Sequence, residues 1–193
     1  MPYPWQRTMS RETIEIRWHG RGGQGAITAA KIFAQGAFVS GFPGVVMAPS
    51  FGTERRGAPV EVSLKVSKAR INDLCPIERP DVVVVLDDSI LHEVNVTAGM
   101  KPGGILVLNT PKGRDAYAGK NVRVATANVT HLAEQAGLKR GIVNTGIIGA
   151  LAKALPIVPL STLLEAIEVE FQGKKAAENA AAARITHAHT TTE

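Results

Sequence analysis

The residues of this chain with the clearest chemical potential form a glycine-rich stretch near its start. Four glycines stand within six residues, after a strand pattern that begins at Ile14 and before an apolar helix pattern that begins at Ala26. Glycine adopts backbone conformations closed to other residues, so the turn can bring bare N–H groups close to whatever lies above the helix N-terminus. We therefore predict a place for an anion or for another chain, formed by Gly20, Arg21, Gly22, Gly23, Gln24 and Gly25.

Three of these glycines, Gly20, Gly22 and Gly25, also fit the G-x-G-x-x-G pattern of dinucleotide-binding folds. In those folds a carboxylate that binds the ribose follows about twenty residues later. Here the second strand pattern ends at 47–50 with no acidic residue. Three interpretations stay open: a bound NAD(P), a purely structural tight turn, and a turn that docks another subunit or a diphosphate-bearing ligand.

The second candidate is a loop between Pro49 and Pro59, which has no hydrophobic period and is bracketed by prolines. Glu54 stands beside Arg55 and Arg56, so it can orient one guanidinium while the pair binds a carboxylate or phosphate. A solvated surface turn is the alternative. Because we expect the loop near the carboxyl end of the sheet, beside the glycine turn, we favour a functional loop. Its candidate residues are Ser50, Phe51, Gly52, Thr53, Glu54, Arg55, Arg56 and Gly57.

Other polar residues have simpler explanations. His19 borders the glycine turn and can act as a general acid or base, but pairing with a backbone carbonyl is the favoured interpretation. Asp87 and Asp88 follow an apolar strand and cap the next helix, with a functional carboxylate at the switch point of the sheet as the alternative. Cys75 precedes a proline and has no positively charged neighbour in sequence, so we expect an inert thiol.

The elements around these residues alternate between strands and helices. Val60 to Val66 alternates apolar and polar residues, which predicts a strand near a sheet edge with one face buried. The continuous apolar runs 82–86 and 105–109 predict central strands covered on both faces. Shorter strand patterns occur at 45–47 and 122–124, and helices are expected over 26–40, 89–98, 129–136, 142–155, 160–171 and 174–188.

This order predicts an α/β fold, a Rossmann-like three-layer domain with a mostly parallel, mixed sheet and helices on both faces. We expect Ser161 to be the N-cap of the 160–171 helix. The small residues Gly146 and Gly149 suit close packing of the 142–155 helix against another surface. Three segments follow: an extension over 1–13, an α/β domain over 14–172, and an alanine-rich helical tail over 173–193, disordered from His187 to Glu193 in isolation.

Composition limits the function classes. The chain has 193 residues and a net charge of +5, from 22 Lys and Arg against 17 Asp and Glu, with no lysine-rich run. We therefore expect no nucleic-acid partner and, without an apolar run long enough, no membrane span. One cysteine excludes a four-cysteine cluster or zinc site built from this chain alone. We expect no metal site at His187 and His189, which lie on different helix faces, and a cytoplasmic protein.

The motifs together resemble a known family. His19 to Gly25, the loop from Pro49 to Pro59 and the helix start at 144–146 are similar to the gamma subunit of 2-oxoacid:ferredoxin (acceptor) oxidoreductases, the pyruvate synthase family. The resemblance covers 14–183. It implies a multisubunit enzyme that oxidatively decarboxylates a 2-oxoacid on thiamine diphosphate with Mg²⁺, passes electrons through iron–sulfur clusters and usually releases an acyl-CoA.

The resemblance also implies a division of labour among subunits. Thiamine diphosphate lies between alpha and beta, clusters lie in beta and in a ferredoxin-like delta subunit, FAD belongs to a further subunit in some complexes, and gamma packs against alpha near the active site. This chain then holds no cofactor and no catalytic residue of its own. Arg55 or Arg56 would form a salt bridge across the interface or touch the CoA phosphates. The alternatives are a free-standing NAD(P)-binding protein and an assembly scaffold without a ligand.

Overall fold

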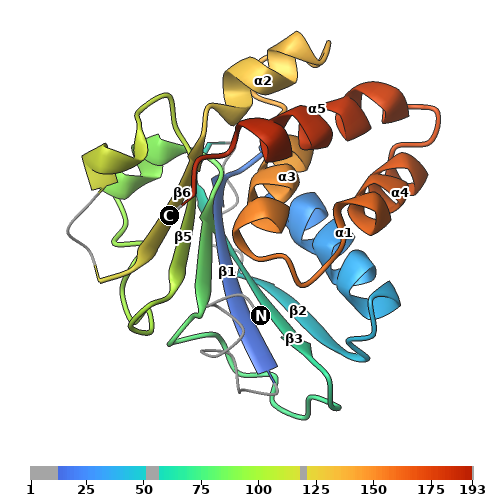
Figure 1. Ribbon diagram of the computed structural model, residues 1–193. Coiled ribbons are helices and arrows are strands. Elements are labelled where there is room, and N and C mark those ends of the chain that lie inside the picture. Colours follow the sequence, from blue (N-terminus) through green and yellow to red (C-terminus); the bar gives the residue numbers. More distant parts are fainter. Residues whose placement is uncertain (1–12, 51–56, 118–120, 193) are drawn as a thin grey trace, which may run out of the picture.

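The computed structural model describes residues 13–50, 57–117 and 121–192 (Figure 1). A sheet with the strand order β2-β3-β1-β4-β5-β6 forms its centre. The strands β1, β4, β5 and β6 are parallel, whereas β3 is antiparallel to both β1 and β2. The predicted mixed sheet is thus confirmed. The strands are β1 (Thr13–Arg21), β2 (Gly44–Ser50), β3 (Pro59–Ser67), β4 (Val82–Val85), β5 (Ile105–Asn109) and β6 (Arg123–Ala127).

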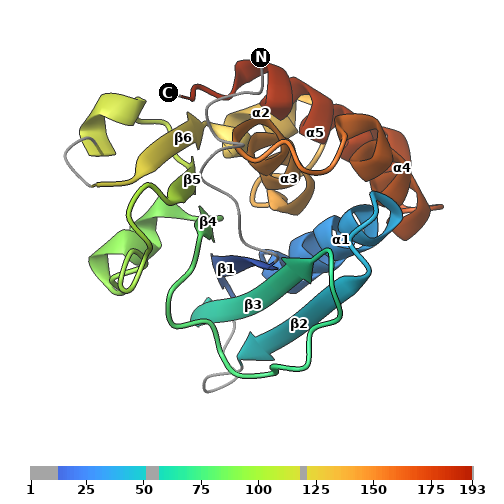
Figure 2. The same ribbon diagram turned by 60° about the horizontal axis from the view of Figure 1, so that its bottom comes forward.

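The five α-helices of the described residues all pack on one face of the sheet (Figures 1 and 2). The opposite face is covered by two short 3-10 helices and their connecting segments. Val82 and Val84 of β4 point into the helical layer, and Val83 and Val85 point to the other side, so β4 is buried on both faces as predicted. The α-helices are α1 (Ala26–Val39), α2 (Val129–Gln135), α3 (Asn144–Ala154), α4 (Leu160–Glu170) and α5 (Ala176–His189), and the 3-10 helices are η2 (Asp88–His92) and η3 (Arg114–Tyr117).

The prediction of a helix over 89–98 is wrong. Only η2 forms there, ending at His92, and the chain continues through turns to Met100. Ile90 and Val96 are the two fully buried side chains of this stretch, and they do not supply the continuous apolar stripe that an α-helix needs. Asp87 does cap the short helix, because its side chain accepts a hydrogen bond from the Ser89 backbone N–H.

The strand β3 is buried on both faces, although its alternating pattern predicted burial of one face only. Val62 and Leu64 face the α-helices, whereas Ser63 and Lys65 lie under the segment that follows β3. The Ile77 N–H donates to the Ser63 hydroxyl, and the Lys65 ammonium binds Asp73. A polar face therefore becomes buried because the next segment supplies partners for it.

The C-terminal helices also correct two expectations. Ser161 lies inside α4, whose N-cap is Pro159, so Ser161 is not the cap. The residues from His187 onward are ordered in the structure as far as Thr192: α5 continues to His189, and Thr191 pairs with Thr126 of β6. The predicted close packing is confirmed, because a Cβ at Gly149 would overlap the Ala183 carbonyl of α5. Within the described residues, no helix has the length and apolar character to cross a membrane.

Candidate functional site

The glycine turn lies at the carboxyl end of β1, where the sheet topology changes direction. From β1 the chain passes through α1 to the β2 edge, whereas β4, the other neighbour of β1, leads toward β6. In open α/β sheets, ligands bind outside the carboxyl ends of the strands at such a switch point. Gly20 and Arg21 still belong to β1, so the turn itself is shorter than predicted and runs from Gly22 to Gly25.

Two of the glycines are required for different reasons. Gly25 is the N-cap of α1 and has a φ of 80°, in the left-handed region. A Cβ at Gly25 would also lie 2.9 Å from Nδ2 of Asn144, at the start of α3. Gly20 has ordinary backbone geometry, but a Cβ there would lie 3.2 Å from the Cβ of Ala26. The turn therefore lets α1 begin directly against β1 and α3.

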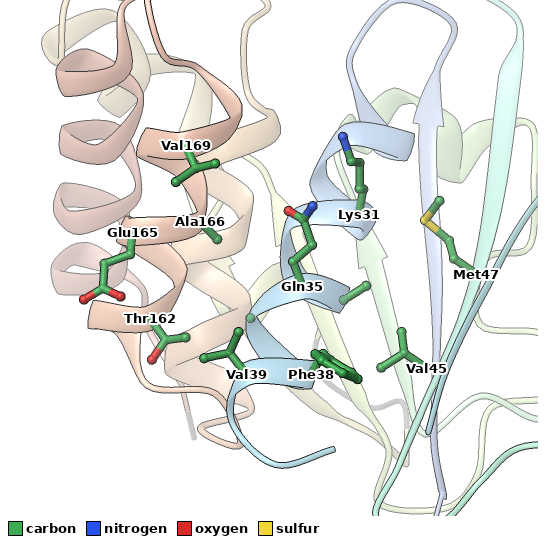
Figure 3. A pocket seen from close by; sticks show the side chains of 12 residues that line it. Lys31, Gln35, Phe38, Val39, Val45, Met47, Thr162, Glu165, Ala166 and Val169 are labelled. Atoms are coloured by element: carbon green, nitrogen blue, oxygen red, sulfur yellow. The ribbon is translucent and has the colours of Figure 1, made fainter. Parts of the chain in front are cut away.

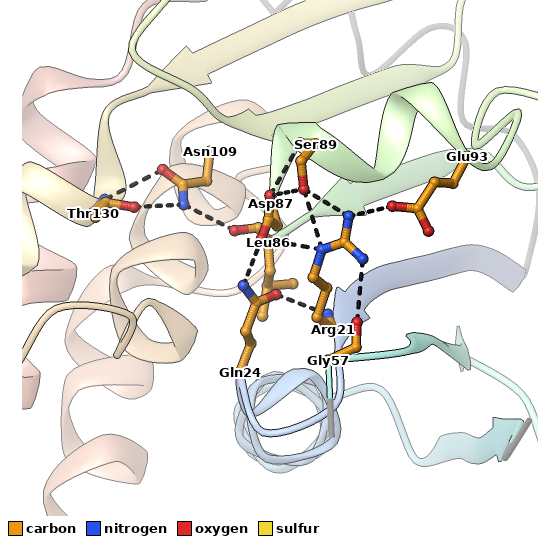
Figure 4. A network of polar contacts seen from close by, with 9 residues as sticks. All are labelled: Arg21, Gln24, Gly57, Leu86, Asp87, Ser89, Glu93, Asn109 and Thr130. Carbon is orange, nitrogen blue, oxygen red and sulfur yellow. Dashed lines mark hydrogen bonds and ion pairs between the residues drawn. The ribbon is translucent and has the colours of Figure 1, made fainter. Parts of the chain in front are cut away.

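Arg21 is the centre of a polar network that joins the turn to its neighbours (Figure 4). Its guanidinium donates to the Ser89 hydroxyl at 2.8 Å, to Glu93 Oε1 at 2.6 Å and to the Gly57 carbonyl at 3.2 Å. The hydrogen bond that Arg21 donates to Glu93 raises the pKa of Arg21 above its ordinary value, so the side chain stays charged. Arg21 thus connects the glycine turn, Gly57 and the η2 stretch rather than extending into solvent.

Gln24 and Asp87 complete the network. The Gln24 amide oxygen accepts from the Arg21 backbone N–H at 2.8 Å, and its nitrogen donates to Asp87 Oδ2 at 2.8 Å. Burial raises the pKa of Asp87, but hydrogen bonds from Ser89 and Gln24 and the charge of Arg21 outweigh it, so the pKa lies below its ordinary value. Asp87 therefore lies at the switch point of the sheet, as the alternative interpretation of this residue expected. Its negative charge is compensated within the chain by Arg21.

The second predicted stretch adjoins the turn at its Gly57 end. The Gly22 N–H donates to the Ala58 carbonyl at 2.9 Å, and the Gly57 N–H donates to the Gly22 carbonyl at 3.2 Å. At the other end of the stretch, Ser50 is the last residue of β2, so the connection is shorter than predicted. Phe51, Gly52, Thr53, Glu54, Arg55 and Arg56 lie outside the described residues.

Two asparagines that were not proposed as site residues lie at the same edge of the sheet. Asn109 ends β5, donating to the Leu86 carbonyl at 2.8 Å and to the Thr130 hydroxyl at 3.1 Å. Asn144 begins α3 and is only 8% exposed, and its Oδ1 has no hydrogen-bond partner among the described residues. The signal for Asn109 was available in the sequence, because a polar residue there ends a continuous apolar strand, as Asp87 does.

His19 and Cys75 are poor candidates for acid–base or nucleophilic chemistry. We expected the His19 ring to pair with a backbone carbonyl, and this expectation is wrong. Among the described residues, the ring instead accepts a hydrogen bond from Nε of Arg17 at 3.2 Å. Burial and the charge of Arg17 lower the pKa of His19 to about 4, so the ring is neutral at pH 7. The hydrogen bond to Asp73 raises the pKa of the exposed Cys75 thiol. No cluster of potential metal ligands occurs in the described parts of the chain.

The geometry argues against a dinucleotide site of the usual kind. In the dinucleotide-binding fold the strand that follows the first helix lies beside the first strand and carries the acid that binds the ribose. Here β2 follows α1 but lies at the sheet edge, and the antiparallel β3 occupies the place next to β1. The backbone donors of the turn remain, but the ribose-binding position does not exist.

A separate groove lies near the C-terminal half of α1 (Figure 3). It has a volume of about 590 Å³ and is bounded by α1, α4 and β2. Phe38 and Val39 on α1 are 61% and 75% exposed, and Val169 on α4 is 76% exposed. Lys31 pairs with Glu170 at 2.8 Å. The lining is mostly apolar, so this groove suits association with apolar groups rather than anion binding.

Comparison with known proteins gives concordant results. The family model described as pyruvate ferredoxin/flavodoxin oxidoreductase matches residues 15–188. The "Pyruvate/ketoisovalerate oxidoreductases common subunit gamma" of Thermococcus litoralis is 47% identical over 176 residues, which is 89% of this chain and 94% of that protein.

Two solved structures have the same fold. The pyruvate oxidoreductase subunit PORC from Thermotoga maritima has a TM-score of 0.82 and 33% identity, covering 95% of this chain and 99% of that one. A 2-oxoglutarate:ferredoxin oxidoreductase from Magnetococcus marinus, solved with 2-oxoglutarate, coenzyme A and succinyl-CoA bound, has a TM-score of 0.74 and 19% identity. The match covers 95% of this chain and 32% of that longer chain, and at this identity it supports the fold alone.

Proposed function

The chain belongs to the pyruvate ferredoxin/flavodoxin oxidoreductase family, and we propose that it is the gamma subunit of a 2-oxoacid:acceptor oxidoreductase complex. The observation that carries the proposal is similarity over nearly the whole length of named gamma subunits, at 47% identity to one of them. The chain then contributes to an oxidoreductase without containing a complete active site.

Pyruvate is the first candidate substrate of the complex, with 2-oxoisovalerate second, because the Thermococcus subunit is named for both acids. The proposed partners are alpha and beta subunits that hold thiamine diphosphate with Mg²⁺ between them, and a ferredoxin-like delta subunit. Iron–sulfur clusters lie in beta and delta, and FAD belongs to a further subunit where NAD is the acceptor. The exposed free thiol of Cys75 is compatible with the reducing cytoplasm in which we place the complex.

The face formed by Gly20–Gly25 and Gly57 is the proposed contact with the catalytic subunits. Arg21 holds Gly57 against the turn, and Arg55 and Arg56 immediately precede Gly57 in the sequence. Guanidinium groups and backbone N–H groups are the donors that suit the phosphates of CoA or the carboxylates of a partner.

Affinity purification of the tagged full-length chain from its own cells tests the assignment. The expected result is co-purification of larger chains that carry thiamine diphosphate and iron–sulfur clusters, with CoA-dependent reduction of a viologen dye by pyruvate. The free-standing alternative predicts a chain that purifies alone and gains thermal stability from NAD(P). Purification alone, without dye reduction by any 2-oxoacid, would contradict the gamma-subunit proposal.

Replacing both arginines, Arg55→Ala with Arg56→Ala, tests their role in the assembled complex. We expect weaker assembly or a Michaelis constant for CoA raised about tenfold, because the loss of one charge-assisted hydrogen bond costs roughly 1.5 kcal/mol. Lys31→Ala is the matched control, since it removes a positive charge on the same chain beside the groove. Unchanged assembly and an unchanged Michaelis constant would remove the arginines from the proposal.

A further inference from the structure

The exposed large apolar side chains of the described residues gather mainly at the groove between α1, α4 and β2. Phe38 and Val39 on α1 and Val169 on α4 line it (Figure 3). The other exposed large apolar side chain among the described residues, Leu74, lies in the segment between β3 and β4. Single exposed apolar side chains are common, but a group of them beside a groove indicates an interaction surface. The groove is therefore a candidate docking surface.

The floor of the groove is formed where α1 and α4 touch. A Cβ at Gly36 of α1 would lie 2.7 Å from Cδ2 of Leu163 on α4, so the two helices are in direct contact there. Val45 and Met47 of β2, which pack against the helical layer, form the other wall. The volume of about 590 Å³ is in the range of cavities that hold drug-sized ligands. The groove can therefore accept an aromatic side chain and the backbone beside it.

The first strand begins close to this groove (Figure 1). Thr13 of β1 is paired in register with Ser67 of β3, and Ser67 is paired with Gly44, the first residue of β2. Because neighbouring strands lie about 4.8 Å apart, the backbones of Thr13 and Gly44 are separated by roughly 10 Å. The next residue, Val45, lines the groove. The twelve residues that precede Thr13 can span at most about 40 Å, so the groove is within their reach.

The amino-acid sequence of residues 1–12 suits an apolar groove. It contains Tyr3 and Trp5, which are one of the two tyrosines and one of the two tryptophans of the whole chain. Aromatic side chains bury a large area and are frequent anchors of docking surfaces. The match to the family model begins at residue 15, so these aromatic residues are an addition to the family domain rather than a part of its core.

The charges of the two surfaces are also complementary. Residues 1–12 carry two arginines, Arg7 and Arg11, against one acidic residue. At the groove, Lys31 is already paired with Glu170 at 2.8 Å. Glu165, at the edge of the groove, has no ion-pair or hydrogen-bond partner among the described residues. An arginine of residues 1–12 can therefore pair with Glu165 without breaking an existing contact of the described chain.

From these observations we propose that residues 1–12 dock in the groove of the same molecule. Trp5 is the apolar anchor, in contact with Val39 and Val169, and an arginine of the segment pairs with Glu165. The docked segment covers the apolar groove, which is then closed to a second copy of the chain. The proposal does not depend on the gamma-subunit assignment, because it involves only residues of this chain.

Acrylamide quenching of tryptophan fluorescence tests the docking in the full-length chain with a C-terminal tag. The other tryptophan, Trp18, is fully buried, and Trp5→Phe measures its background. Trp5 should be quenched at least about threefold less efficiently than N-acetyltryptophanamide, because apolar side chains shield a docked indole. The double variant Val39→Ser with Val169→Ser should remove this protection. The control Leu74→Ser changes a comparably exposed apolar residue outside the groove and should be quenched like wild type.

A charge variant tests the same docking without changing the apolar lining. Glu165→Gln should raise the quenching of Trp5 up to about twofold at low ionic strength and leave it unchanged in 1 M salt, because an exposed ion pair is weak and is screened. Glu168→Gln is the matched control, since it makes the same change on the same helix outside the groove lining. This comparison decides the question if circular dichroism shows that the double variant does not fold.

Three results would overturn the proposal. The first is a wild-type Trp5 that is quenched as efficiently as the free compound. The second is protection that persists in both the valine and the Glu165 variants, or that Leu74→Ser removes, because the segment would then lie elsewhere on the molecule. The third is protection that is lost on dilution, which would place residues 1–12 in the groove of a second copy.

Discussion

The two ends of helix α1 present opposite kinds of surface. At its N-terminus, Arg21, Gln24 and Asp87 form a hydrogen-bonded network around bare backbone donors. At its C-terminus, Phe38 and Val39 are exposed beside an apolar groove. The first surface is made of groups that recognise charge, whereas the second is lined mostly by apolar side chains, with Lys31 and Glu165 among its few charged residues. The difference teaches that polar chemistry on this chain is concentrated at one end of the sheet, where the proposal places the catalytic partners.

The largest expected effect comes from Gly25→Ala. The left-handed backbone costs about 1–2 kcal/mol for a non-glycine residue, and the overlap with Asn144 adds about 1–3 kcal/mol. Denaturant unfolding should therefore show a loss of about 3.5 kcal/mol, taking the middle of both ranges.

Gly41→Ala is the matched control at the other end of α1. Gly41 has nearly the same φ, 86°, but a Cβ there would lie 3.7 Å from the end of the Lys68 side chain. The expected loss is only the backbone cost of about 1–2 kcal/mol. Equal losses for the two variants would mean that the junction with Asn144 is not tightly packed.

The second prediction concerns pH. Burial and Arg17 depress the pKa of His19 from 6.5 to about 4, so the unfolded chain binds a proton that the folded chain does not in this window. The free energy of unfolding should fall as the pH drops from 6.5 to 4, by roughly 3 kcal/mol at most. In His19→Gln this part of the decline should be absent. A decline of the same size in the variant would assign the pH dependence to other groups.

The third prediction concerns Arg21. Its ion pairs are at the surface, so Arg21→Ala should cost about 1 kcal/mol of stability or less. Without its hydrogen bond to Arg21, Gly57 must be fixed at the turn when the ligand binds, which should raise the Michaelis constant for CoA by about three- to tenfold in the complex. Arg21→Lys keeps the charge but loses the forked donors of the guanidinium, so it should restore the Michaelis constant for CoA only in part. Full recovery by lysine would show that charge alone matters.

The smallest effect is expected at the groove. Phe38→Ser removes an exposed ring, so stability should change by about 0.5 kcal/mol or less, and the Michaelis constant for CoA should stay within error of wild type. Steady-state kinetics of the assembled complex give the second value. A raised Michaelis constant would place the groove near the reaction centre and end the contrast between the two ends of α1.

The strands and the fold class could be predicted because they depend on local patterns. The continuous runs in β4 and β5 require cover on both faces, and the sheet provides it. The order of tail residues could not be predicted, because α5 is held by its fit to Gly149 of α3 rather than by an apolar stripe. In the same way, the polar residues Ser63 and Lys65 are buried by the segment between β3 and β4, in which the sequence predicts no helix or strand.

The candidate site likewise has a part that local sequence patterns predict and a part that they do not. The glycine turn and its contact with Gly57 could be predicted from spacing, since glycine clusters have few uses. The packing of Asn144 against Gly25 joins the turn to a helix more than a hundred residues later, and no local pattern specifies this contact. The placement of β3, rather than β2, beside β1 could not be predicted either. This placement removes the ribose-binding position of a dinucleotide fold.

Hydrogen exchange of the glycine turn tests the central claim most directly. The exchange rates of amides 20–25 are compared between the isolated full-length chain and the complex purified with it. If the turn faces the reaction centre of partner subunits, these amides should exchange at least about tenfold more slowly in the complex, because both solvent access and local opening are reduced. Identical rates in the two states would place this face in solvent and contradict the account.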